Sequence, residues 1–208
     1  MTLQIPPCRV CAAMLLFAGL SLCVPGARAT TVVPPSFSEL VAQAQSIVEG
    51  RVLAVRCEQS SGQAGHAIIH TYVNIEVSKV LKGPAQATIE LRLLGGTVGD
   101  RTMQVAGVPR FVPGQRALLF VENNGRQFCP LVGVMHGRYH LVRRASDGAE
   151  IVRRDNGAPL RSLADIGRPM DHDEARAAIA EGSADAAGLT MDQFENSIRE
   201  ELDHAANR

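Results

Sequence analysis

The chain has 208 residues, of which 20% are charged, and its formal net charge at neutral pH is zero. This length is enough for one domain of ordinary size with a tail or a small appendage. Tryptophan is absent, and the chain has only six Phe and two Tyr. The sequence therefore has too few aromatic residues to favour a binding platform of aromatic side chains for sugars or nucleobases. The core must come from Val, Ile, Leu, Met and Ala.

The N-terminus has the three parts of a secretory signal peptide. Arg9 supplies a positive end, residues 10–24 are largely apolar, and small residues precede a cleavage site before Thr30. We therefore expect a signal peptide at 1–29 and export to the periplasm or the extracellular space. The apolar stretch is shorter than the about 20 residues of a membrane span, so no stable membrane insertion is expected after cleavage. A retained anchor, or a lipid on Cys23, is the alternative.

Cleavage would leave two of the five cysteines, Cys57 and Cys129. Two cysteines allow one connectivity, and in an oxidising compartment we expect them to form a disulfide. In the chain-entropy model such a bond would stabilise the fold by about 4 kcal/mol. Two buried free thiols are the alternative. A metal site or a catalytic thiol is weakly supported, because the spacing is wrong for a metal and no base lies beside either cysteine.

Charge is distributed unevenly along the chain. The segment 31–161 has 15 Lys and Arg against 10 Asp and Glu, whereas 162–208 has 4 against 11. A basic body and an acidic tail could attract each other or have separate partners, and a normal solvated surface is the simpler interpretation. The basic residues cluster only at 143–144 and 153–154, so nucleic-acid binding is not expected.

The pattern of apolar residues predicts a short helix followed by strands. Ser36 is the expected N-cap of the helix, with Glu39 as its capping-box partner. Alternating or continuous apolar runs predict strands at 47–57, 70–81, 88–94, 117–121 and 128–142, with shorter ones at 103–105 and 150–152. Bends or bulges are expected at Gly50, Gly133 and Gly137, and a glycine-rich loop at 95–100. Short, evenly spaced strands indicate a mainly β domain over 30–160, as a small closed or nearly closed barrel.

The segment 161–208 is predicted to be an acidic, partly helical C-terminal tail. A helix is expected at 173–181, and a second one begins at Thr190, the expected N-cap, with Gln193 as its capping-box partner. The second helix has a narrow apolar stripe, which could dock on the body of the protein or on another protein. The stripe consists of Phe194, Ile198 and Leu202 or Ala205.

The sequence does not predict a catalytic, cofactor-binding or metal-binding residue. Two histidine pairs are four residues apart, at 66 and 70 and at 136 and 140. Each pair falls in or beside an expected strand, where that spacing separates the side chains by about 13 Å. The sequence contains none of the usual nucleophile motifs, and the glycines at 95–99 lack the Lys of a phosphate loop. Arg110 lies between two prolines, where it could contact an anion or simply be solvated.

Three segments together resemble a known fold family. They are Ile47-Val48-Glu49-Gly50-Arg51-Val52, the strand and turn from Val73 to Gly83, and Pro113-Gly114-Gln115-Arg116-Ala117-Leu118-Leu119-Phe120. Over about 36–143 the chain resembles the OB-fold barrels of the netrin-like and tissue-inhibitor-of-metalloproteinase type, and more closely a group of uncharacterised exported bacterial proteins. The resemblance implies a five- to six-stranded OB-like barrel that serves as a binding module or a protease inhibitor. The animal inhibitors present an N-terminal cysteine to zinc, and Thr30 occupies that place here.

These observations favour an exported, non-catalytic barrel that binds another protein, with an extracellular protease as a candidate for binding or inhibition. The partner's identity is open. The alternative is an envelope-associated structural protein that docks through its C-terminal helix. A metal-dependent hydrolase ranks third, and a pocket that gathers His136, His140 and a carboxylate would favour it.

Overall fold

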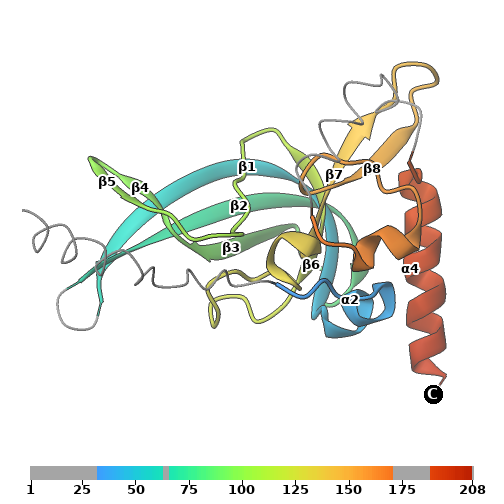
Figure 1. Cartoon of the computed structure of the whole chain (residues 1–208), viewed down its shortest axis with the longest axis horizontal. Coiled ribbons are helices and arrows are strands. Elements are labelled where there is room, and N and C mark those ends of the chain that lie inside the picture. Colours follow the sequence, from blue (N-terminus) through green and yellow to red (C-terminus); the bar gives the residue numbers. More distant parts are fainter. Residues whose placement is uncertain (1–31, 63–65, 171–187, 208) are drawn as a thin grey trace, which may run out of the picture. The chain divides into compact units, whose positions relative to one another are not determined.

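The computed structural model describes residues 32–62, 66–170 and 188–207, and it shows a mainly β protein with one short helix and one long C-terminal helix (Figure 1). The described residues belong to one compact unit that begins at Val32. The elements in chain order are α2 (Phe37–Gln43), β1 (Ser46–Ser61), β2 (Ala67–Lys82), β3 (Thr88–Leu94), β4 (Gly96–Val98), β5 (Arg101–Met103), β6 (Arg116–Val121), the 3-10 helix η2 (Val134–Gly137), β7 (Arg138–Arg143), β8 (Glu150–Arg154), the 3-10 helix η3 (Leu163–Gly167) and α4 (Met191–Ala206). None of the described helices is both long and apolar enough to cross a bilayer.

The helix α2 begins with the capping box that the sequence predicts. The Ser36 hydroxyl accepts a hydrogen bond from the Glu39 amide at 3.3 Å, and the Glu39 carboxylate accepts one from the Ser36 amide at 2.8 Å. Two of the free amides at the helix start are thereby satisfied. The helix buries Leu40 and Val41, which fixes it against the sheet.

The long hairpin of β1 and β2 is the main structure of the sheet, and it bends at Gly50. The register between the two strands shifts at Glu49/Gly50. A Cβ atom at Gly50 would lie 2.5 Å from the carbonyl oxygen of Glu76, so only glycine allows the strands to approach this closely. The predicted bend at this position is confirmed.

The main sheet is antiparallel, in the order β3-β2-β1-β6-β7-β8, and β4 and β5 form a separate hairpin. The sheet is not closed, but a segment that follows β6 lies along the outer side of β3. The Leu94 amide donates to the Phe128 carbonyl at 2.7 Å, and the Asn124 side-chain amide donates to the Glu90 carbonyl at 2.7 Å. At the other end, the Val152 amide of β8 donates to the Leu189 carbonyl at 3.0 Å. Both edges of the sheet are therefore covered by chain.

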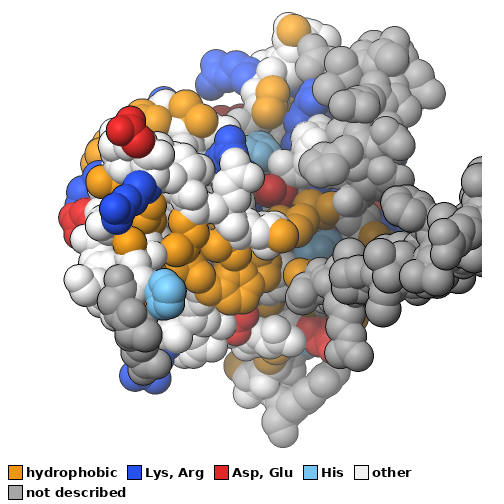
Figure 2. All heavy atoms as spheres, turned by 60° about the vertical axis from the view of Figure 1, so that its left-hand side comes forward, with side chains coloured by type: hydrophobic (Ala, Val, Ile, Leu, Met, Phe, Trp, Pro, Cys, Tyr) orange, Lys and Arg blue, Asp and Glu red, His pale blue; other side chains and the backbone are white. Residues whose placement is uncertain are grey.

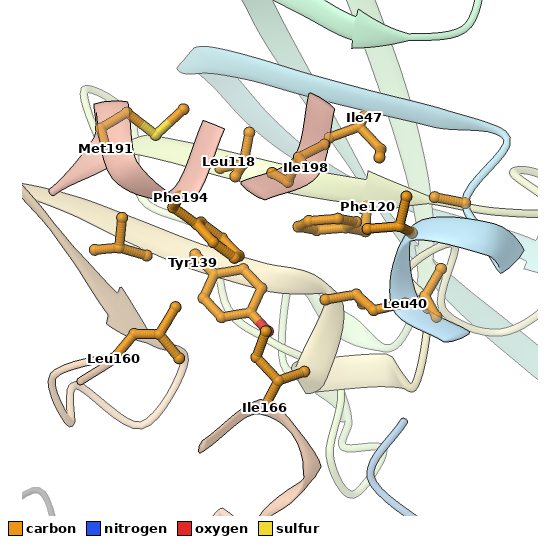
Figure 3. Packing of buried hydrophobic residues seen from close by; sticks show 14 residues of the cluster. Leu40, Ile47, Leu118, Phe120, Tyr139, Leu160, Ile166, Met191, Phe194 and Ile198 are labelled. Carbon is orange, nitrogen blue, oxygen red and sulfur yellow. The ribbon is translucent and has the colours of Figure 1, made fainter. Parts of the chain in front are cut away.

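Buried apolar residues form two clusters. One lies within the curved sheet and includes Val73, Leu91 and Leu119. The other joins the sheet to the helices, and there Phe194 of α4 lies beside Phe120 of β6 and Tyr139 of β7 (Figure 3), and also near Phe37 of α2. Its ring centroid lies 6.1 Å from Phe37, 6.2 Å from Phe120 and 5.2 Å from Tyr139.

The C-terminal helix α4 thus docks on the body, which is one of the two possibilities that the sequence leaves open. Its capping box of Thr190 and Gln193 is present as predicted, and Phe194 and Ile198 are fully buried. The acidic helix also forms an ion pair with the body, between Glu195 and Lys79 at 2.8 Å. The apolar stripe is occupied by the protein itself. The predicted helix at 173–181 lies outside the described residues.

Two predictions of local structure are wrong. The expected strand at 128–142 is a loop, then η2, and only then β7, because Gly133 and Val134 both have positive φ angles of about 60° that a strand cannot contain. Gly137 is packed so closely that a Cβ would lie 2.8 Å from the Val132 backbone. The glycine-rich segment 95–100 is not only a loop, since Gly96–Val98 pairs with Arg101–Met103.

Candidate functional site

A solvent-filled groove of about 480 Å³ opens where β6 begins, between the turn before it and the outer half of β7. β6 pairs with β7 only from Ala117 to Leu119. The two strands therefore separate past the pair of Ala117 and His140, and form a fork at the start of β6. The groove combines basic, polar and apolar side chains with glycine backbone. Its lining residues are Arg51, Gly114, Gln115, Arg116, His140, Leu141, Val142, Arg153 and Gly157.

Strand register forms two pairs of basic residues at the groove, one on each face of the sheet, because Ala117, the residue next to Arg116, is the one that pairs with His140. Arg51 of β1 pairs with Arg116 of β6, and His140 of β7 pairs with Arg153 of β8. Paired residues of an antiparallel sheet project from the same face and lie within about 5.5 Å of each other. Two like charges directly opposite each other destabilise a sheet, so the pairing of Arg51 with Arg116 requires compensation.

Two carboxylates provide that compensation for Arg116. Its guanidinium binds Glu49 and Glu150 at the same time. Burial opposes its positive charge, but these hydrogen bonds outweigh burial and raise the pKa of Arg116. Arg51 instead donates to the Gly114 carbonyl at 3.2 Å and is exposed. Arg116 is therefore a fixed part of the wall, whereas Arg51 presents its charge to the solvent.

A buried ion pair lies next to His140, one of the groove residues. Arg138 is 5% exposed and binds Asp155, donates to the Arg110 carbonyl at 2.5 Å, and lies 4.6 Å from the centre of the Phe111 ring. Arg110 therefore contributes its backbone to this arrangement. A guanidinium with this many partners is held rigidly, so the pair fixes the start of β7 to the segment that directly follows β8.

His140 connects this ion pair to the groove. Its Nε2 lies 3.9 Å from Oδ1 of Asp155, while the same oxygen is bound by Arg138. Burial first, and then the positive charge of Arg138, lower the pKa of His140. At neutral pH the ring is uncharged and can both donate and accept a hydrogen bond. Asp155 is held by Arg138, which makes it a poor partner for activating His140 as a base.

The histidine pairs of the sequence do not meet at a common site. His136 lies in η2 and is 3% exposed, and His140 lies in β7 at the groove. Burial lowers the pKa of His136 to about 4, with the charge of Arg154 as a second cause. His66 precedes β2, and His70 lies within it. Among the described residues, no group of three or more His, Cys, Asp or Glu is arranged to hold a metal ion.

Both cysteines face the same core, but each is a free thiol. Cys57 pairs with Thr71, which pairs with the buried Leu93, so all three project from one face of the sheet. Cys129 belongs to the core cluster on that face, and burial raises the pKa of its thiol to about 12. The disulfide between Cys57 and Cys129 is not formed here and stays a prediction.

A second surface feature is apolar. Figure 2 turns the far end of the β1–β2 hairpin toward the reader and shows apolar side chains gathered at the centre of this face, with charged side chains around them. Large apolar residues that are exposed in the described part of the chain include Leu53, Val112 and Phe128, which are 48%, 56% and 45% exposed. Contiguous apolar surface of this kind marks interaction sites in many proteins.

Sequence reasoning missed the groove because its residues come from four strands. Arg153 belongs to the basic pair 153–154 that the sequence analysis noted, but its neighbour Arg154 points the other way and is 1% exposed. Arg51 and Arg116 lie at the ends of strands, with no local pattern that sets them apart. The one signal available was a charged residue at the start of an otherwise fully apolar strand, Arg116.

No protein-family model matches this sequence, and a search of curated proteins finds no match. The function has therefore to be inferred from the groove and the surface around it.

Proposed function

We propose that the protein is an exported, non-catalytic binding module of the OB type, and that the groove at the fork of β6 and β7 holds an acidic segment of a partner protein. The single observation that carries this proposal is the groove lining. The lining combines the positively charged residues Arg51 and Arg153 with the apolar residues Leu141 and Val142. Guanidinium groups bind carboxylates in bidentate fashion, and the apolar residues favour an extended peptide over a free anion.

Several features support the OB-type barrel. The segment after β6 forms a bridge between Val121 and Leu131 and reaches β3 at Leu94. One core cluster, with Val48, Val73 and Leu119 among its members, fills the interior of the curved sheet. A barrel with strands β1, β2, β3 and β6 and this segment as a partial fifth member has the strand number of the OB type.

Export rests on the N-terminal signal, and the domain boundary agrees with it. The compact unit begins at Val32, just after the expected cleavage site before Thr30. The mature chain would then retain every described strand and the helices α2 and α4. A partner in the periplasm or the extracellular space, with an extracellular protease as one candidate, follows from this location.

The test is affinity capture of exported proteins on the tagged mature domain, 30–208, with wild type and with the variant Arg51→Glu/Arg153→Glu. The reversal is expected to lose the specific partner, because two favourable charges become repulsive to an acidic segment. The matched control is Arg126→Glu, an exposed arginine outside the groove, which should keep it.

Recovered partners are then measured by titration at two salt concentrations and assayed for protease inhibition. A charge-dominated contact weakens as salt rises. If the groove variant binds the same partners as wild type with the same affinity, the groove is not the binding site and the proposal fails.

A further inference from the structure

The outer side of β1 is open over its second half. β6 pairs with β1 only from Ser46 to Arg51, and the turn before β6 extends this contact to Val52. From Ala54 to Ser61 no strand in the described part of the chain pairs with the side of β1 that faces away from β2. Figure 1 shows this half of the hairpin projecting beyond β6, β7 and β8. An open edge of this length is a template for pairing with another strand.

The protein covers its other long edges, which makes this one exceptional. The segment that includes Asn124 and Phe128 lies along β3, and the segments around Ala158 and Leu189 lie along β8. Natural sheets that must stay single protect their edges with lysines, prolines or bulges. The stretch 54–61 has no lysine and no proline, its only charges are Arg56 and Glu58, and the register shift of β1 between Val52 and Ala54 lies at its start and not within it.

Those two charges are arranged symmetrically about Cys57. They project from the same face of the strand, as their contact at 3.0 Å shows, and about half of each side chain is exposed. Arg56 also binds Glu90 and lies 4.5 Å from the centre of the Tyr72 ring. If two copies of this strand pair in antiparallel fashion with Cys57 at the centre, Arg56 of each copy lies opposite Glu58 of the other.

We propose that the segment Ala54–Ser61 pairs with the same segment of a second copy, and so forms a two-fold dimer with one sheet continuous through both chains. The occupant is a second copy because the segment is complementary to itself: its net charge is zero, and the register centred on Cys57 places opposite charges across the strand pair twice. Opposite charges directly across an antiparallel pair stabilise it, and like charges destabilise it. The symmetry is that of the commonest class of homo-oligomer.

The test measures the dimer dissociation constant by sedimentation equilibrium over roughly 1 µM to roughly 1 mM protein, the range in which weak associations fall. The protein is the mature chain, 30–208. Arg56→Glu and Glu58→Arg each place like charges opposite each other at both symmetric positions, and each is expected to raise the dissociation constant by at least about tenfold. The double variant Arg56→Glu/Glu58→Arg restores opposite charges and should restore association.

Arg101→Glu, a reversal of an exposed arginine on β5, is the matched control and should leave the dissociation constant unchanged. Circular dichroism on each variant confirms that the fold is intact. A wild-type chain that stays monomeric over the whole range would overturn the proposal. So would single reversals that do not weaken the dimer, or a double variant that associates no better than the single ones.

Discussion

Replacing Phe194 with alanine tests whether the C-terminal helix is part of the fold. The side chain is fully buried, and three aromatic rings lie around it with centroids 5.2 to 6.2 Å away. Removing a buried Phe typically costs about 3–5 kcal/mol, the sum of lost transfer energy and the cavity left behind. The upper half of this range is expected, because the surrounding rings belong to α2, β6 and β7 and cannot close the cavity together.

The free energy of unfolding is measured by urea titration. Far-UV circular dichroism is the signal, because the chain has no tryptophan. For a chain of this size a loss of about 4 kcal/mol lowers the melting temperature by about 8–16 °C. Asn196→Ala on the exposed side of the same helix is the control, and it should change stability by less than about 0.5 kcal/mol. A loss below about 1 kcal/mol for Phe194→Ala would refute the docked position of α4.

Three further predictions concern single residues. The pKa of His136 is lowered to about 4 in the folded protein, so below about pH 6.5 the unfolded state binds one more proton than the folded state, and up to about 3 kcal/mol of stability is lost as pH falls from 6.5 to 4. In a pH series of urea titrations, the variant His136→Asn should lose less stability over this range than wild type. The control variant His66→Asn, at an exposed position, should lose as much as wild type. The pKa of the Cys129 thiol is raised to about 12, so iodoacetamide should label Cys129 far more slowly in the reduced native protein than in the protein unfolded in urea. Peptide mass spectrometry measures the labelling, and rapid labelling of the native thiol would contradict its burial. Asn124→Ala removes the contacts with Glu90 and Arg92 and should cost about 1 kcal/mol, measured by urea titration, with no loss expected for the exposed Arg126→Ala.

Local sequence signals predicted the elements that depend on local chemistry. The capping boxes at Ser36 and Thr190 were predictable because the partners are three residues apart in the chain. The strand β3 was predictable because one of its faces meets the core, which produces the alternation seen at Leu91 and Leu93. The bend at Gly50 was predictable from a different local signal, since an isolated glycine within a strand pattern indicates close approach of another backbone.

The incorrect strand at 128–142 shows the limit of this approach. Cys129, Leu131 and Val132 are all buried, so their apolar character fits a strand as well as it fits a loop. They are buried because other parts of the chain enclose the segment. Two hydrogen bonds hold it there: the Val132 amide donates to the Phe120 carbonyl of β6, and the Phe128 carbonyl accepts from Leu94 of β3. Enclosure of this kind depends on the tertiary fold and leaves no period in the sequence.

The groove was unpredictable for a different reason. Arg51 and Arg116 become neighbours only through strand pairing, and Arg153 joins them in lining the groove only through the tertiary fold, at sequence separations that no motif spans. The buried Arg138 and Arg154 even resemble surface residues in the sequence, because arginine is rarely buried without partners. Their partners, Asp155 for Arg138 and the Arg168 carbonyl for Arg154, are supplied by the fold.

The two cysteines allow the disulfide and the dimer to be tested separately. Cys57 faces the core that contains Cys129, whereas the dimer uses the backbone edge of the same strand, so both can exist together. The oxidised wild-type chain is therefore expected to run as a monomer on a non-reducing gel, because Cys129 has consumed the thiol of Cys57. In Cys129→Ser, Cys57 should instead meet Cys57 of the second copy, directly opposite at Cα distances that a disulfide accepts, and a covalent dimer should appear. Association in sedimentation without this covalent dimer would show that the strands pair in another register, because no other register places the two Cys57 residues opposite each other.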